Sequence, residues 1–221
     1  MGSKELNVKN FYNTFIESIK NGTVKYPDKN YNPWKESKAR YHNRYTAYIN
    51  NDLMPKCFKQ FSDGCSNEYY RLDVSGWKQF KQEAEDICKK VNMNPYLWDL
   101  QIAFEHENKK KDWFDEVIKL LYVNCKLKVV VGYNDYKNRD NHDYSDENKL
   151  DALCEILKKL PRINELLSDE NGENNTLLVI IGNCGSGYEE LDCKEYFGYR
   201  GYQIYLEGID VKHKRLDNEN R

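Results

Sequence analysis

Three acidic residues, Asp73, Glu105 and Glu107, have the types and spacing that a divalent-metal site needs. Glu105-His106-Glu107 closes the segment 96–105, in which apolar and polar residues alternate, and this alternation predicts a strand. Glu105 and Glu107 then share the polar face, while His106 lies on the apolar face as a packed or bridging residue. Two neighbouring carboxylates repel each other unless a cation lies near them, and such hard oxygen ligands suit Mg²⁺ or Mn²⁺.

A third carboxylate would define this site, and the sequence offers two. Asp99 is on the same predicted strand face as Glu105, but six residues away, which is about 20 Å at the rise of a strand. Asp73 is in the preceding predicted strand, residues 68–77, and neighbouring strands are only about 5 Å apart. Asp73 is therefore the better partner of Glu105 if these strands pair. The alternative is that the acids are solvated residues at a strand end.

The elements expected around these residues alternate between helices and strands. Apolar spacing and turn signals predict helices over residues 5–20, 34–50, 78–92, 113–124, 149–160 and 162–168, and strands over 68–77, 96–105, 126–133, 176–181 and 202–209, followed by a charged tail. In residues 78–92, Phe80, Ala84, Ile87 and Val91 form one apolar stripe. In residues 113–124, Trp113, Val117, Leu120 and Leu121 face inward after Asp112, a candidate N-cap. We predict an α/β fold with a mixed central sheet flanked by helices.

The expected organisation is a single domain over residues 1–221. It comprises an N-terminal helical part (1–62), a core (68–133) and C-terminal helices and strands that complete the sheet (134–221). Hydrophobic residues make up 39% and charged residues 32% of the chain, which is typical of a globular protein with a very polar surface.

The chain also shows no CxxC pair among its 7 cysteines, no secretory signal and no apolar run of membrane-spanning length. These features predict a cytoplasmic protein that does not enter a membrane and keeps reduced thiols. Cys88, Cys125 and Cys154 fall at apolar positions and are predicted to lie in the core.

Nucleic-acid binding is compatible with the charge pattern, but only locally. The net charge of −2 argues against a chain-wide electrostatic grip on nucleic acid. Three basic clusters are candidates for a local groove: Lys35, Lys38, Arg40 and Arg44; Lys109, Lys110 and Lys111; and residues 212–215. Each cluster alone is most often a solvated face.

Residues 68–133 resemble the core of the PD-(D/E)xK nuclease superfamily, which is restriction-endonuclease-like. The resemblance is carried by LDVSG with Asp73, AFEHEN with Glu105 and Glu107, the helix 113–124 and the strand KVVVGY. It implies that Asp73 and Glu105 bind Mg²⁺ or Mn²⁺. Glu107 stands where most members have Lys, and it would orient a water or bind a second metal.

The resemblance also supplies a role for the helix that follows the site. Lys119 is a candidate for a catalytic lysine relocated to that helix, and its alternative is an ordinary surface charge. Glu116 would buttress this lysine or a metal-bound water, although a solvated helix acid is the simpler interpretation.

Taken together, the resemblance implies a metal-dependent endonuclease that hydrolyses DNA, with a type II restriction enzyme as its sharper form. DNA is the expected partner, and a homodimer is compatible with the resemblance. The alternative function is a nuclease-fold module that binds nucleic acid or protein without cleaving it.

Overall fold

Strands form one mixed sheet in the computed structural model, which describes residues 4–20, 46, 48–69, 71–93, 98–107, 112–135, 145–184 and 198–216. The sheet contains seven strands in the described part of the chain, and their order in space is their order in sequence. They are β1 (Gly64–Tyr69), β2 (Leu72–Gln79), β3 (Trp98–His106), β4 (Leu127–Asp135), β5 (Thr176–Cys184), β6 (Arg200–Glu207) and β7 (Asp210–Arg215). Strands β3, β4 and β5 are parallel, whereas all other neighbouring pairs are antiparallel. The predicted α/β class with a mixed sheet is confirmed.

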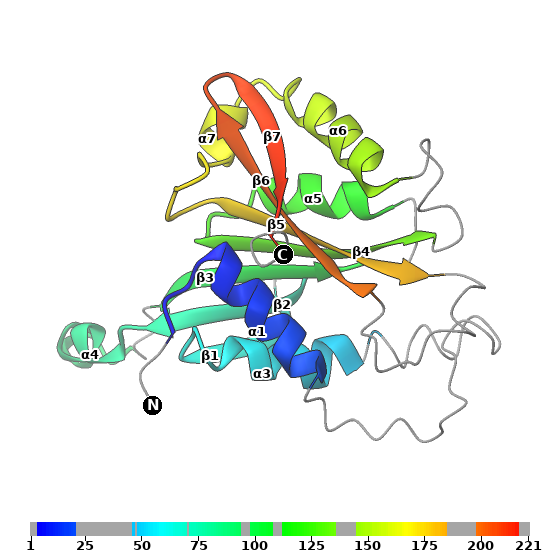
Figure 1. Ribbon diagram of the computed structural model, residues 1–221. Coiled ribbons are helices and arrows are strands. Elements are labelled where there is room, and N and C mark those ends of the chain that lie inside the picture. The colour runs from blue at the N-terminus through cyan, green and yellow to red at the C-terminus, as the bar shows by residue number, and fades with distance from the viewer. Residues whose placement is uncertain are drawn as a thin grey trace.

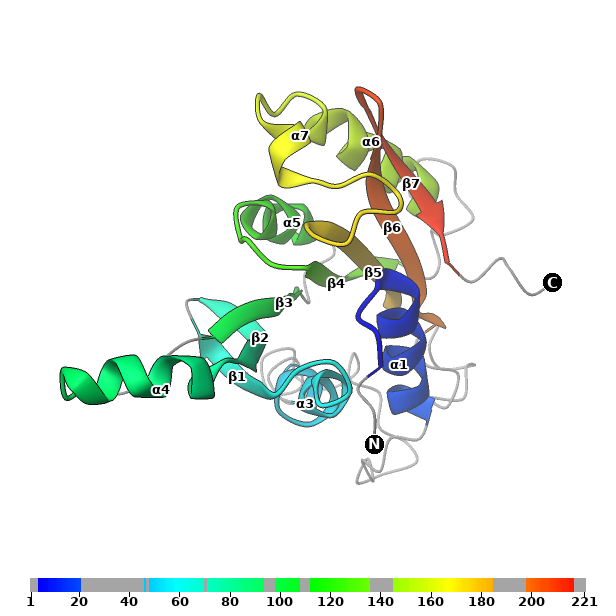
Figure 2. The same ribbon diagram turned by 90° about the vertical axis from the view of Figure 1, so that its left-hand side faces the viewer.

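Helices cover both faces of this sheet (Figures 1 and 2). On one face lie α1 (Val8–Lys20), the π-helical turn η1 (Tyr48–Leu53) and α3 (Met54–Phe58). On the other lie α5 (Trp113–Leu121), α6 (Asp146–Leu157) and α7 (Ile163–Leu166). Helix α4 (Lys81–Lys90) covers neither face and projects from the end of β2 and β3. No described helix is long and apolar enough to cross a membrane.

Two apolar cores result, one on each side of the sheet. Under α1, η1 and α3, residues such as Phe11, Phe58 and Phe104 are fully buried. The hydroxyl of Tyr12 on α1 donates to the backbone oxygen of Tyr199, 3.1 Å away, and so ties the first helix to the last part of the sheet.

The second core holds α5 against β3 and β4. Trp113, Val117, Leu120 and Leu121 are all buried there, as the sequence predicts. Gly132 on β4 permits the close approach, because a Cβ at that position would lie 2.6 Å from the Trp113 ring. Asp112 occupies the N-cap position of α5, but its side chain forms no capping hydrogen bond.

The prediction of one strand over residues 68–77 is wrong, because the chain turns back between β1 and β2. The turn has no glycine or proline to announce it. Glu68 (φ 53°) and Arg71 (φ 62°) take left-handed conformations instead. The charged tail also forms a strand: β7 pairs with β6 after a turn at Gly208 (φ 65°).

The predicted helix 78–92 exists as α4, but its apolar stripe is not core. The side chains of Ile87 and Val91 are 67% and 65% exposed. Cys88 is half-buried, whereas Cys125 and Cys154 are buried as predicted. Periodicity shows which residues share a helix face, but it does not show whether anything covers that face. Most of the predicted helix 34–50 lies outside the described residues.

Candidate functional site

The strands that carry Asp73 and Glu105 do pair. Strands β2 and β3 are antiparallel with Val74 opposite Phe104, which places Asp73 beside Glu105 on the neighbouring strand. The backbone N–H of His106 donates to Asp73 Oδ2 at 2.8 Å and fixes that carboxylate against the end of β3. The condition on which the predicted site depended is therefore met.

Helix α5 brings a lysine to this pair of acids. Lys119 Nζ lies 2.7 Å from Glu105 Oε1, and it donates to Glu116 Oε2 at 2.8 Å. The contact between Lys119 and Glu105 is an ion pair. Lys119 thus reaches Glu105 from α5, and its assignment as a catalytic lysine stays a prediction. Glu116 is a partly exposed helix acid that pairs with Lys119, and its role as a buttress stays a prediction.

An asparagine that the sequence did not single out completes the surroundings of Asp73. Asn50 on η1 is buried, and its side chain hydrogen-bonds to the Asp73 carboxylate. The N-terminal helices therefore contribute directly to the site. No spacing in the sequence links Asn50 to Asp73, and only the packing of η1 beside β2 brings them together.

Burial governs the charges of this cluster, which we define as Asp73, Glu105, Glu116 and Lys119. The side chain of Glu105 is only 3% exposed. Burial raises its pKa to about 8, helped by the negative charge of Asp73 and opposed by Lys119. Burial likewise raises the pKa of Asp73, although the His106 amide opposes it. Burial lowers the pKa of Lys119, but its contacts with Glu105 and Glu116 outweigh this and leave its pKa raised.

This electrostatic arrangement suits a cation. Glu105 Oε1 is buried and accepts no hydrogen bond, and the cluster holds three carboxylates to one ammonium. In the described residues, no three His, Cys, Asp or Glu side chains are grouped closely enough to enclose a metal ion. Mg²⁺, however, is usually bound by one or two carboxylates together with waters and substrate phosphates. Asp73 and Glu105 fit that pattern.

The residues flanking Glu105 take different places. Glu107 follows β3, its backbone N–H donates to Val131 O at 2.9 Å, and its side chain is half-buried. Its assignment as a catalytic residue stays a prediction. His106 is buried on the opposite face, with Nε2 2.8 Å from the Tyr133 hydroxyl, and burial lowers its pKa to about 3. The prediction that His106 is a packed, bridging residue is confirmed.

A buried lysine anchors the helix that carries Lys119. Lys128 on β4 is 0% exposed. Its ammonium donates to Leu121 O at 3.2 Å, to Leu166 O at 2.8 Å and to Asn175 Oδ1 at 3.0 Å. It therefore caps the C-terminal ends of α5 and α7, where the helix dipole favours a cation. Its signal in the sequence is a lysine inside a continuous apolar strand, which a buried strand does not carry without partners.

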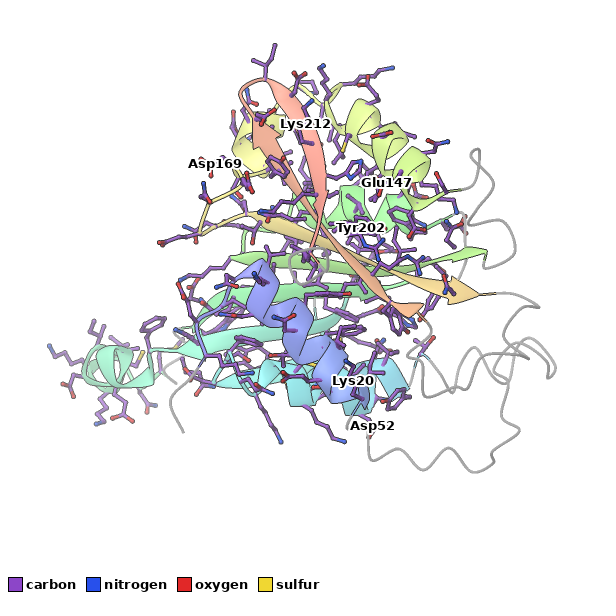
Figure 3. The ribbon with its side chains drawn as sticks, viewed as in Figure 1. Lys20, Asp52, Glu147, Asp169, Tyr202 and Lys212 are labelled. Atoms are coloured by element: carbon purple, nitrogen blue, oxygen red, sulfur yellow. The ribbon has the colours of Figure 1, made fainter. Side chains whose placement is uncertain are left out.

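A second polar cluster lies where β4 and β5 end. Asp146, in the first turn of α6, forms an ion pair with Arg200 and accepts hydrogen bonds from Asn134 (2.8 Å) and the Tyr202 hydroxyl (3.0 Å). Tyr202 lies beneath that turn, near Glu147 (Figure 3). These contacts fix α6 to the sheet, and no spacing in the sequence indicates them.

Only one of the three predicted basic clusters lies within the described residues. Lys35, Lys38, Arg40 and Arg44 lie outside the described residues, as do Lys109, Lys110 and Lys111. The cluster at 212–215 is part of β7. Lys212 is exposed, but His213 lies 3.0 Å from Asp151, and Lys214 forms an ion pair with Glu170. Acids therefore already occupy part of this third cluster.

Comparison with known proteins gives no family for the chain: no protein-family model, no curated protein and no solved structure matches it.

Proposed function

We propose that the chain is a metal-dependent nuclease that hydrolyses DNA phosphodiester bonds, with Mg²⁺ or Mn²⁺ bound by Asp73 and Glu105. One observation carries the proposal: the pairing of β2 with β3 sets Asp73 beside Glu105, and α5 delivers Lys119 to the same point. The residues come from β2, β3 and α5, in the order that the resemblance to PD-(D/E)xK nucleases implies.

The protein's own residues have distinct roles in this proposal. A divalent ion held by the two acids would polarise the phosphate and lower the pKa of water. Asp73, held by the His106 amide, and Glu105, at the end of β3, would supply the two carboxylate ligands of that ion. Lys119 stays protonated because Glu105 and Glu116 raise its pKa. The Lys119 side chain is 39% exposed, so its ammonium would supply a positive charge for the phosphate.

The test is cleavage of supercoiled plasmid and of phage DNA by the purified chain, with Mg²⁺, Mn²⁺ or EDTA. We expect metal-dependent cleavage, lost at least about a hundredfold in Glu105→Gln, which keeps the shape of the side chain and removes its charge. Glu155→Gln is the matched control, because Glu155 is an exposed acid on α6. Discrete bands would indicate a restriction enzyme, and a smear would indicate a nuclease without sequence preference. Cleavage that persists in Glu105→Gln would refute the proposed site.

The second candidate is a nuclease-fold binding module without activity. It is favoured by the ion pair between Lys119 and Glu105, which neutralises Glu105 without any metal. The two candidates differ in metal binding. A nuclease should gain thermal stability in millimolar Mg²⁺ or Mn²⁺, by RT ln(1 + [L]/Kd), and Asp73→Asn should lose the gain. No stabilisation and no cleavage, with nucleic-acid binding unchanged in Asp73→Asn, would favour the binding module.

A further inference from the structure

Helix α4 carries an apolar stripe with no cover among the described elements. Ile87 and Val91 are 67% and 65% exposed, and Met93, just beyond the helix, is 66% exposed. Ala84 and Cys88 lie on the same stripe and are half-buried. Figures 1 and 2 both show α4 projecting away from the sheet and its other helices. An exposed apolar face of this kind marks a site of protein association.

The charges of α4 identify its partner. Glu85 and Asp86 lie in the middle of the helix, and Lys89 and Lys90 lie at its C-terminal end. Among the described residues, Lys89 lies 3.4 Å from Glu85 and 4.0 Å from Asp86, in pairs at the protein surface. Such surface pairs contribute about 0.5 kcal/mol at most and remain available to a second partner.

We propose that α4 is a homodimerisation arm, which packs its apolar stripe antiparallel against α4 of a second copy. An antiparallel arrangement sets Glu85 and Asp86 of one helix beside Lys89 and Lys90 of the other, twice over. A parallel arrangement would set like charges together. A two-fold interface must be self-complementary, and α4 has that property in both its apolar stripe and its charges.

The position of α4 leaves the acidic cluster free. Helix α4 follows the end of β2–β3 where Gln79 pairs with Trp98, whereas Asp73 and Glu105 lie at the other end of the same strands. The arm therefore does not depend on the proposed nuclease activity. A helix of 10 residues is about 15 Å long, so the interface is small and the dimer should dissociate in the micromolar range.

The first experiment measures mass against concentration, by light scattering and sedimentation equilibrium. We expect the full chain to change from 26.3 kDa towards twice that mass across the micromolar range. Ile87→Lys should raise the dissociation constant at least about tenfold, because it buries a charge at the centre of the stripe. Ile156→Lys is the matched control, since Ile156 is 46% exposed on α6. A wild-type chain that stays monomeric at the highest concentration would overturn the proposal.

The second experiment separates association from helix stability. Glu85→Lys/Asp86→Lys makes α4 uniformly basic over these four positions, and Lys89→Glu/Lys90→Glu makes it uniformly acidic. Neither variant should associate with itself, whereas an equimolar mixture of the two should form dimers at least as tight as those of the wild-type chain. Circular dichroism checks that both variants are folded. A mixture that associates no better than its components would refute the antiparallel pairing.

A cross-link locates the contact independently of both results. Cys88 is a free thiol on the stripe, next to the central Ile87. An antiparallel pair centred there brings the two copies of Cys88 close together. A short bis-maleimide should therefore yield a covalent dimer from the wild-type chain and none from Cys88→Ser. A covalent dimer that forms equally in Cys88→Ser would place the interface elsewhere.

Discussion

Replacing Lys128 with methionine should weaken the attachment of α5 and remove a characteristic pH dependence of stability. Burial lowers the pKa of Lys128 to about 8, against 10.5 for a free lysine. The folded state therefore binds fewer protons than the unfolded state between these two values. Stability of the wild-type chain must rise with pH across that window, by up to about 3 kcal/mol, since one pKa unit corresponds to about 1.4 kcal/mol.

Below pH 8 the ammonium is charged, and its cost of burial is offset by its three oxygen acceptors. Lys128→Met removes that cost but leaves Leu121 O, Leu166 O and Asn175 Oδ1 without this donor, at about 1–3 kcal/mol for each group left unsatisfied. We expect a net loss of about 1–3 kcal/mol at pH 7, and a larger loss at pH 10.

The assay is urea unfolding followed by tryptophan fluorescence at pH 7, 8, 9 and 10. Lys126→Met is the control, because Lys126 precedes the same strand and is half-buried. Its difference from the wild-type chain should not change with pH, and other titrating groups cancel in both comparisons. A Lys128→Met difference that is also independent of pH would refute the assigned pKa. A variant more stable than the wild-type chain at pH 7 would show that the three hydrogen bonds do not compensate for the buried charge.

Three further predictions concern the polar residues around the sheet. In metal-free buffer, the raised pKa of Glu105 contributes stability below the pKa of the unfolded state, and this contribution is lost as pH rises through about 8. Glu105→Gln does not titrate. Its stability relative to the wild-type chain should therefore rise between pH 5 and 8, as measured by thermal unfolding. Arg200 holds the pKa of Asp146 below its usual value despite burial, so this pair stabilises the fold above the unfolded pKa of Asp146 and loses its effect in acid. Asp146→Asn should therefore lower the free energy of unfolding by about 3 kcal/mol at pH 7 and by less at pH 3, as measured by urea unfolding. Asn50→Ala should lower the free energy of unfolding by about 1–2 kcal/mol and reduce the stabilisation by Mg²⁺, because Asp73 loses its side-chain donor. An unchanged response to Mg²⁺ would show that Asn50 does not position the Asp73 carboxylate.

The acidic site was predictable to the extent that it depends on local patterns. Alternation along β3 put Glu105 on the polar face and His106 on the apolar face, and the structure agrees. The relative places of Asp73 and Lys119 followed from the order of strand, strand and helix in the resemblance. What local patterns do not contain is burial, and it is burial that gives Glu105 a raised pKa and makes Glu116 a partner of Lys119.

Contacts between distant segments could not be predicted from the sequence. Asn50 reaches Asp73, and Arg200 reaches Asp146, only because the sheet brings separate segments together. The prediction that the stripe of α4 lies in the core was wrong because the stripe has the period of a core helix. Nothing in the local sequence shows that this helix projects from the body of the protein. The turn between β1 and β2 was not predicted because Glu68 and Arg71, rather than glycines, take left-handed conformations near it.

The strand order has a consequence for how the chain folds. Every strand in the described part of the chain pairs with its neighbour in sequence, so the sheet can grow from its N-terminal edge as the chain is synthesised. Asp73, Glu105 and Lys119 are all present before β5 is made. Helix α1 differs, because its tie to Tyr199 spans 187 positions. Helix α1 is therefore expected to complete its docking only after Tyr199 is made, and the apolar face that it covers needs protection until then.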